Sequence, residues 1–349
     1  IVDNGMYFHQ GEFEPLLGYA AMLEIDNQYH RQQYGLAEKP SDLLAPISQK
    51  RSFSATLTTV SSQTALTSGE LVRQWQQQGR SYYQYVMRQN IYPVVGFLSA
   101  EFHTHQFQAD GIPVTLYYHP QHQHNVAEIA KATTFTMQYM QQHFGDYAYP
   151  SLKLIEVPQY HAFGGRASAG IVALNESLFL QDYQDGAAIN NVARNTIHEV
   201  AHQWFGDKIT CGTWKDIWLN EGFATYLSAL VIENLDGLNA FIAQKASMVD
   251  YITSSPSGNL YLTDVQLTDV GRIFSSRLSY NKGAMVLEML RFKMGDTAFF
   301  QALRNYLADP NLAYDYAVTT DLKAHLEAVY GQSLTEFFND WVYNQGYPT

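Results

Sequence analysis

Cysteine is almost absent from this 349-residue chain, and the single thiol at Cys211 excludes an internal disulfide and a thiolate-rich metal site. Its expected place is the protein interior. Basic residues are also scarce, because 21 Lys and Arg stand against 33 Asp and Glu, for a formal net charge of -12. Such a charge repels phosphate backbones, and no local Lys/Arg cluster reverses it, so we expect no nucleic-acid partner.

Long apolar runs are missing as well. The stretch 91–100 is interrupted well before the roughly eighteen residues that a membrane-spanning helix needs, so we expect no membrane contact by residues 1–349 themselves. The chain begins at Ile1 and shows no basic segment followed by an apolar stretch of the signal-peptide type. We interpret it as a fragment of a longer protein.

Two domains are expected from the length, and a hydrophobic content of 46% is enough for a substantial core. The first part contains stretches of β-branched and aromatic residues, and strands are predicted at 52–61, 94–104 and 111–119. The Gln-rich residues 70–89 show no clean periodicity and receive no predicted element. We predict an incomplete, β-rich accessory domain over residues 1–111.

Helical spacing dominates the second part of the chain. Apolar residues recur at helical intervals over 126–144, which Gly145 ends, and strands are predicted at 152–157 and 170–180. The predicted fold class is therefore α+β, with a mostly helical domain over residues 112–349 that follows the accessory domain.

Two histidines one helical turn apart are the strongest chemical signal. An amphipathic helix is predicted over 188–205 from its apolar stripe, which consists of Ile197, Val200, Ala201 and Trp204. On a neighbouring face, His198 and His202 stack about 5–6 Å apart at Cβ, so one metal ion can bind both imidazoles. Glu199 is rotated by one residue and reaches the open side of such a metal, which suits a general base. The motif is H-E-x-x-H.

A catalytic zinc site needs three protein ligands and one open position. Glu221 is the candidate for the third ligand, because it lies near the start of a predicted helix over 220–233. Small residues follow it at i+3, i+4 and i+7, namely Ala224, Thr225 and Ser228. A face of small side chains would let this helix pack closely on the first one. We therefore predict a single Zn²⁺ ion bound by His198, His202 and Glu221.

The residues around these positions resemble the aminopeptidase N family of gluzincin zinc metallopeptidases. The segments that carry the resemblance are 198–207 (HEVAHQWFGD), 218–224 (WLNEGFA), 280–284 (YNKGA) and 341–348 (WVYNQGYP). The resemblance covers about residues 112–349 and implies a thermolysin-like catalytic domain that hydrolyses peptides. It also implies that the hydroxyl of Tyr280 stabilises the tetrahedral intermediate. A phenol can donate a hydrogen bond to an oxyanion that develops beside zinc.

One departure from the family concerns the substrate's free α-amino group. The family's exopeptidase signature, Gly-Ala-Met-Glu-Asn, aligns with Gly164, Gly165, Arg166, Ala167 and Ser168. The glutamate of that signature pairs with the substrate's ammonium group, but Ala167 occupies its position here and Arg166 would repel an ammonium ion. Glu176 is a candidate replacement. The resemblance thus implies a substrate-binding segment that comprises Gly164, Gly165, Arg166, Ala167 and Glu176.

A second resemblance is to peptidase domains fused to bacterial transporter-like membrane proteins. It is carried by residues 4–6, 18–19, 31–36 and 160–176, and it implies a membrane-associated or extracytoplasmic parent protein. We expect a zinc-dependent, aminopeptidase-like hydrolase of peptides with altered recognition of the amino terminus. Two alternatives stay open: an endopeptidase of the same fold, and a zinc-containing domain that binds peptides with little turnover.

Overall fold

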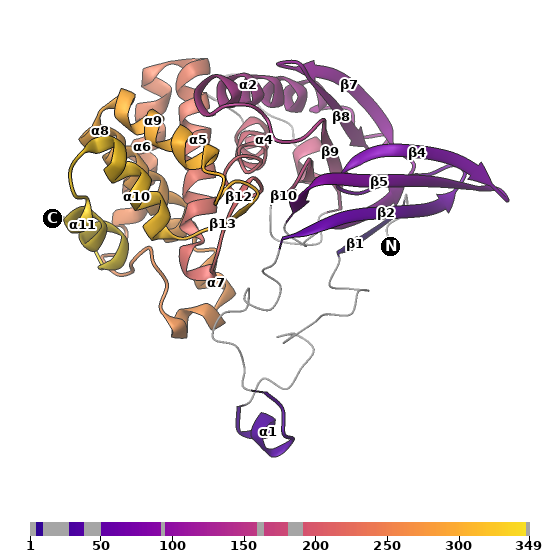
Figure 1. Ribbon diagram of the computed structural model, residues 1–349. Helices are drawn as coiled ribbons and strands as arrows, with labels where there is room; N and C mark the ends of the chain where they lie inside the picture. Colours follow the sequence, from indigo (N-terminus) through magenta and orange to yellow (C-terminus); the bar gives the residue numbers. More distant parts are fainter. Residues whose placement is uncertain are drawn as a thin grey trace.

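The computed structural model describes residues 5–9, 28–37, 50–91, 95–158, 164–180 and 191–346. Residues 4, 18–19 and 160–163 of the transporter-like resemblance lie outside these ranges, as do residues 94 and 188–190 of the predicted elements and residues 347–348 of the family resemblance. In Figure 1 the strands gather at one side of the molecule and most helices at the other, with α4 (Asn191–Ala201) and α5 (Trp218–Asp236) near the centre. The predicted α+β class is confirmed.

Two three-stranded sheets occupy the first part of the chain. Their strand orders are β1-β6-β3 (Gly5–His9, Gly96–Ala100, Thr64–Leu66) and β2-β5-β4 (Arg51–Val60, Arg80–Ile91, Glu70–Gln77). The predicted strand at 52–61 is confirmed as β2. The predicted strand at 94–104 is too long, because β6 ends at Ala100.

The Gln-rich residues without a predicted element form the β4–β5 hairpin. Its turn consists of Gln78 and Gly79, whose φ values of 50° and 73° are those of a two-residue hairpin turn. Alternate residues of β5 are buried, including Tyr83 and Tyr85, whereas β4 is exposed over most of its length. Pairing with β5, rather than a buried face of its own, makes β4 a strand, and periodicity cannot reveal that.

A five-stranded sheet begins the second part of the chain. Its order is β10-β11-β9-β8-β7 (Gly165–Ser168, Ile171–Asn175, Leu152–Val157, Ile112–Tyr118, His103–Ala109). The predicted boundary between residues 111 and 112 falls inside the β7–β8 hairpin, whose pairing runs from His103 with Tyr118 to Ala109 with Ile112. Backbone pairing therefore places β7, predicted as accessory, in the sheet of the second part.

The predicted strand at 170–180 is wrong in its second half. Strand β11 ends at Asn175, and the short helix α3 (Ser177–Leu180) follows. The side-chain Oδ1 of Asn175 accepts a hydrogen bond from the N–H of Ser177 at 2.9 Å, and this local turn ends the strand. The predicted strand at 152–157 is confirmed as β9 with both of its bounds.

Both faces of the five-stranded sheet are covered. Leu152 and Leu154 of β9 belong to the core that the sheet shares with α4 and with α2 (Val126–Phe144), a helix predicted with both of its bounds. Ile155 belongs instead to a smaller core with Leu66 and Leu98 of the first three-stranded sheet. This double burial agrees with the burial of the first five residues of β9, which include Lys153 and Glu156 as well as apolar residues.

Helices make up most of the remainder. They are α1 (Gln28–Gln33), α6 (Leu238–Thr253), α7 (Val270–Ile273), α8 (Gly283–Met294), α9 (Asp296–Ala308), α10 (Thr319–Tyr330) and α11 (Thr335–Phe338), with π-helical segments at Ser276–Lys282 and Asn339–Tyr343. A parallel pair, β12 (Ile209–Cys211) and β13 (Asp315–Ala317), buries Cys211 as expected. Within the described ranges, no helix has the length and apolar character needed to cross a bilayer.

Candidate metal centre

Helix α4 and the turn that follows it carry the first two predicted ligands. All four residues of its predicted apolar stripe are buried, and this packing fixes the rotation of the helix. The regular helix ends at Ala201, earlier than predicted, but the N–H of His202 still donates to the carbonyl of His198 at 3.3 Å. The two imidazoles therefore keep the one-turn spacing, with ring centroids 4.8 Å apart.

Three ligand atoms from α4, the turn that follows it and α5 lie within a few ångströms of one another. The Nε2 atoms of His198 and His202 are 3.2 Å apart, and Oε2 of Glu221 lies 3.3 Å from the first and 3.4 Å from the second. Tetrahedral zinc bonds of about 2.0–2.1 Å would separate neighbouring ligand atoms by about 3.3 Å. The three residues thus fit one face of a zinc tetrahedron. In the part of the chain that the structure describes, they form the one such group of three.

Hydrogen bonding and charge prepare these side chains as ligands. Nδ1 of His202 lies 3.0 Å from the carbonyl oxygen of Phe205, so it donates there and leaves the Nε2 lone pair toward the site. Burial raises the pKa of Glu221, but His202 and His198 outweigh burial and lower it to about 2, so the carboxylate is ionised. Burial lowers the pKa of His202, while Glu221 and Glu199 raise it to a net value of about 9. A cation would compete with that proton.

Glu199 is buried beside strand β10. A Cβ atom added to Gly165 would lie 2.6 Å from Cγ of Glu199, so the strand approaches the helix at a distance that only glycine permits there. Burial raises the pKa of Glu199, and the nearby His198 and His202 oppose that rise. A buried carboxyl group with a raised pKa is suited to accept a proton and pass it on.

Tyr280 is brought to the same place by the π-helical segment Ser276–Lys282. Its ring stacks on that of His198, with centroids 5.7 Å apart and planes 11° apart. Burial raises the pKa of Tyr280, and the carboxylates of Glu221 and Glu199 raise it further, so the phenol keeps its proton and can donate it in a hydrogen bond. Single π-helical turns are frequent at functional sites, and the sequence did not reveal this one.

The segment predicted to bind substrate is β10, an outer strand of the five-stranded sheet. It pairs with β11 along one edge, and within the described residues no strand pairs with its other edge. Arg166 is exposed, and its charge lowers the pKa of Glu199 slightly against the effect of burial. Ala167 packs against the core. Glu176 follows Asn175, whose N–H donates to the carbonyl of Gly164 at 3.0 Å, so it lies beyond the end of β10 that contacts α4.

Gln203 is a site residue that sequence reasoning missed. Its side chain is buried next to His202, where Oε1 accepts the N–H of Gly170 at 2.9 Å. Its Nε2 donates to the carbonyl of Ser168 at 3.1 Å and to Oδ2 of Asp207 at 2.8 Å. One amide therefore joins the β10–β11 turn to the end of the H-E-x-x-H helix. A lone glutamine in an apolar context was its only sequence signal.

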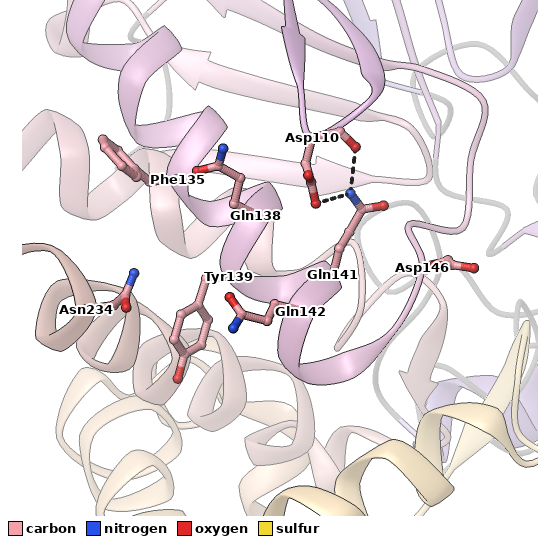
Figure 2. A pocket seen from close by; sticks show the side chains of 8 residues that line it. All are labelled: Asp110, Phe135, Gln138, Tyr139, Gln141, Gln142, Asp146 and Asn234. Atoms are coloured by element: carbon pink, nitrogen blue, oxygen red, sulfur yellow. Dashed lines mark hydrogen bonds between the residues drawn. The ribbon is translucent and has the colours of Figure 1, made fainter.

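A hollow of about 650 Å³ lies away from these residues. It is lined by side chains of α2, the β7–β8 turn and α5, and Figure 2 shows Gln141 hydrogen-bonded to Asp110 there. Gln142, which also lines it, is exposed. Since no predicted site residue lines this hollow, it plays no part in the metal centre.

Replacing Gln203 with Ala should lower the free energy of unfolding by about 2–4 kcal/mol, because the buried N–H of Gly170 and carbonyl of Ser168 lose their partners. Urea unfolding followed by tryptophan fluorescence measures this. Gln142→Ala, on an exposed face of α2, is the matched control and should change stability by less than about 0.5 kcal/mol. Equal losses in the two variants would contradict the role of Gln203.

The geometry agrees with a comparison of the sequence against known families, in which residues 128–341 match the model described as the Peptidase family M1 domain. This chain belongs to peptidase family M1. The family resemblance expressed by the metal-site segments is thereby confirmed. The match covers all five proposed functional residues, which are His198, Glu199, His202, Glu221 and Tyr280.

Curated relatives of this M1 domain include "Aminopeptidase M1-C" from Oryza sativa subsp. japonica, 34% identical over 208 residues that make up 58% of this chain and 23% of that protein. "Tricorn protease-interacting factor F2" from Thermoplasma acidophilum is 32% identical over 234 residues, or 63% of this chain and 28% of the relative. The chain thus spans about a quarter of the length of such relatives.

Among solved structures, an M1 zinc metallopeptidase from Deinococcus radiodurans superposes with a TM-score of 0.67 at 24% sequence identity. The superposition covers 84% of this chain and 64% of that one. A variant of that metallopeptidase, solved with a Tyr-Ser-Ala substrate, gives a TM-score of 0.68 at 22% identity over 86% of this chain and 66% of that one. These likenesses show that the fold is shared.

Proposed function

We propose that this M1 domain hydrolyses peptide bonds with the help of one zinc ion held by His198, His202 and Glu221. The observation that carries the proposal is the spacing of 3.2–3.4 Å among their three ligand atoms, which matches one face of a zinc tetrahedron. The aminopeptidase and zinc metallopeptidase names of the relatives support the same chemistry. When bound, zinc would act as a Lewis acid and lower the pKa of a water molecule.

The chain's own groups supply proton transfer and charge stabilisation. Glu199, buried and with a raised pKa, accepts the proton of the attacking water and returns it to the leaving amine. Tyr280, which keeps its proton, donates a hydrogen bond to the carbonyl oxygen as that oxygen becomes negative. Glu199 thus transfers the proton, and Tyr280 stabilises the negative charge on the carbonyl oxygen.

Strand β10 gives the substrate a place to bind. The edge of β10 with which no described strand pairs can accept an extended peptide as an additional strand, held by main-chain hydrogen bonds. Gly165 lets that edge come close to Glu199. A peptide paired with β10 would therefore lie next to the proposed base.

We further propose that recognition does not require a free α-amino group. The segment nearest to Glu199, which is Gly164 and the first three residues of β10, offers no carboxylate, because it consists of Gly164, Gly165, Arg166 and Ala167. The guanidinium of Arg166 would repel an ammonium group placed there. An endopeptidase, or an enzyme acting on blocked peptides, is the second candidate function, and this segment is the observation that favours it.

A matched pair of peptides, one free and one N-acetylated, tests amine recognition. We expect values of kcat/KM within about 10-fold of each other, because no carboxylate on β10 discriminates between them. Arg166→Glu should shift the preference toward the free amine by about 5-fold, as an exposed charge contributes on the order of 1 kcal/mol. Arg194→Glu, at an exposed arginine of α4, is the control and should leave the ratio unchanged.

The opposite result would have a clear meaning. If acetylation reduced cleavage by more than about 100-fold, an amine anchor would exist, and the proposal that recognition does not require a free α-amino group would be wrong. Glu176→Gln would then show whether the carboxylate beyond the end of β10 is that anchor. Mass spectrometry of a peptide-library digest, with and without a chelator, would also report where peptides are cut. No cleavage by the zinc-loaded protein would favour the peptide-binding alternative.

A further inference from the structure

Helices α5 and α8 touch through two glycines. A Cβ atom added to Gly222 would lie 2.9 Å from Cα and 3.0 Å from the carbonyl carbon of Gly283, and one added to Gly283 would lie 2.9 Å from Cα of Gly222. Since these are backbone atoms, no change of rotamer relieves the overlap. At this point the two helices therefore approach as closely as their main chains allow.

Backbone conformation does not explain these glycines. Gly283 has φ of -56° and ψ of -48°, values that any residue adopts in a helix. A glycine inside a helix costs about 1 kcal/mol relative to alanine. What the pair contributes is therefore the short distance between the two helices.

The contact joins two parts of the proposed site. Gly222 directly follows the metal ligand Glu221, and Gly283 lies three residues after Tyr280, at the point where the π-helical segment passes into α8. A change in the separation of α5 and α8 therefore moves Tyr280 relative to Glu221. The ring of Tyr280 also stacks on that of the proposed ligand His198, with centroids 5.7 Å apart, so the tyrosine contacts the metal-binding group directly.

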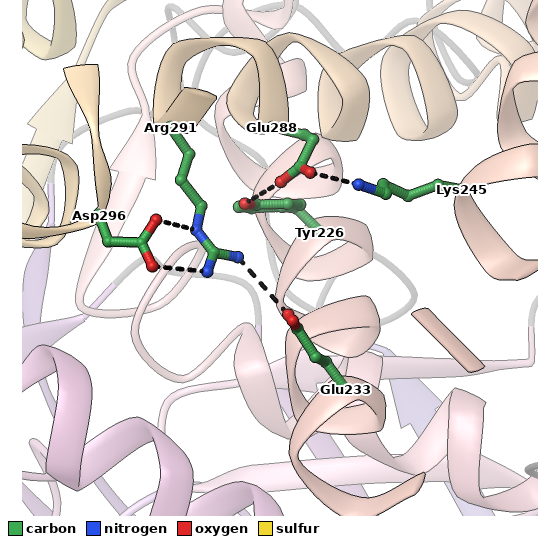
Figure 3. A network of polar contacts seen from close by, with 6 residues as sticks. All are labelled: Tyr226, Glu233, Lys245, Glu288, Arg291 and Asp296. Atoms are coloured by element: carbon green, nitrogen blue, oxygen red, sulfur yellow. Dashed lines mark hydrogen bonds and ion pairs between the residues drawn. The ribbon is translucent and has the colours of Figure 1, made fainter. Parts of the chain in front are cut away.

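Polar contacts hold the same helix pair farther along (Figure 3). The hydroxyl of Tyr226 on α5 donates to Oε2 of Glu288 on α8 at 2.7 Å, and Arg291 on α8 lies 3.5 Å from Glu233 on α5. Lys245 of α6 adds a 2.6 Å ion pair to Glu288. These contacts stabilise the packing of α5 on α8, and the two glycines permit the short distance between the helices.

We propose that Gly222 and Gly283 are positioning residues that set the distance between Tyr280 and the metal-binding group, an inference that rests on the proposed function. An added methyl group must move the helices apart by about 0.5 Å to reach an ordinary contact of 3.4 Å. A misplacement of about 1 Å in an active site can cost about 100-fold in rate, so half of that predicts a loss of about 10-fold.

Gly283→Ala is the central test. The unsubstituted protein must first be shown to have peptidase activity that a chelator abolishes. We expect kcat to fall about 10-fold while KM changes less than about 2-fold. Gly222→Ala should lower kcat similarly and also weaken zinc binding, measured by competition with a chromophoric chelator, because it adjoins Glu221. Gly271→Ala is the control: that helical glycine is exposed, and a Cβ there meets only a side-chain oxygen of Asp269.

A double-mutant cycle with Tyr280→Phe separates positioning from general damage. In a protein that already carries Tyr280→Phe, Gly283→Ala should lower kcat less than about 2-fold. The side chain that Gly283→Ala displaces has no hydroxyl in that protein, so its position no longer affects the rate. Losses that multiply would overturn the proposal, as would unchanged kcat in folded alanine variants.

A second variant covers the case in which the alanine variants do not fold. Tyr226→Phe loosens the same helix pair without a clash, because it removes only the hydroxyl group, which contacts Glu288 and Arg291 of α8. It should lower kcat about 3-fold in the parent and leave kcat unchanged when combined with Tyr280→Phe, and equal losses in both would overturn the proposal. If the unsubstituted protein were inactive, the proposed function would be contradicted rather than the role of the glycines, so the two outcomes can be distinguished.

Discussion

Glu199→Gln is expected to lower kcat by about three to four orders of magnitude, the contribution of a well-placed general base. The amide has nearly the shape of the carboxylate but cannot accept the proton of water. Glu199 does not belong to the group of three ligand atoms, so zinc content should stay at one ion per chain. Steady-state kinetics and metal analysis on the same sample give both readouts.

The control for this substitution is Glu336→Gln, at an exposed position of α11, which should leave kcat within about 2-fold. Loss of zinc from the Glu199→Gln protein would mean that Glu199 is a structural partner of the ligands rather than the base. Retention of full activity would remove proton transfer by Glu199 from the proposed mechanism altogether.

The arrangement of the three proposed metal ligands was predictable because most of their geometry is local. His198, Glu199 and His202 belong to one helix and the turn after it, and helical periodicity fixes which way each side chain points. Burial of the apolar stripe through Trp204 then orients the face that carries the histidines. The prediction of Glu221 needed a further argument, because this residue lies on a second helix that must fold back onto the first. That argument was that a catalytic zinc ion needs a third protein ligand.

The features that escaped prediction depend on residues far apart in sequence. Strand β4 is a strand because β5 pairs with it, and β7 belongs to the five-stranded sheet because it pairs with β8. The backbone contact of Gly222 on α5 with Gly283 of α8 was likewise not predicted, because it joins residues 61 positions apart in the sequence.

Tyr280→Phe should lower kcat by about two to three orders of magnitude, as removal of one oxyanion donor generally does. The ring can still stack on His198, so the substitution removes the hydroxyl and little else. KM should change less than about 3-fold, because the hydrogen bond strengthens as the carbonyl oxygen becomes negative in the transition state. Tyr251→Phe, at a tyrosine of α6 that is 47% exposed, is the control.

The pH dependence of that loss tests the role of the phenol independently. Burial and the neighbouring carboxylates raise the pKa of Tyr280 above its ordinary value of 10, so the donor form persists at every pH below that value. The ratio of parent to Tyr280→Phe kcat should therefore stay constant from about pH 6 to about pH 9. A ratio that fell toward one across this range would show that the phenol ionises, and an ionised oxygen cannot donate to an oxyanion.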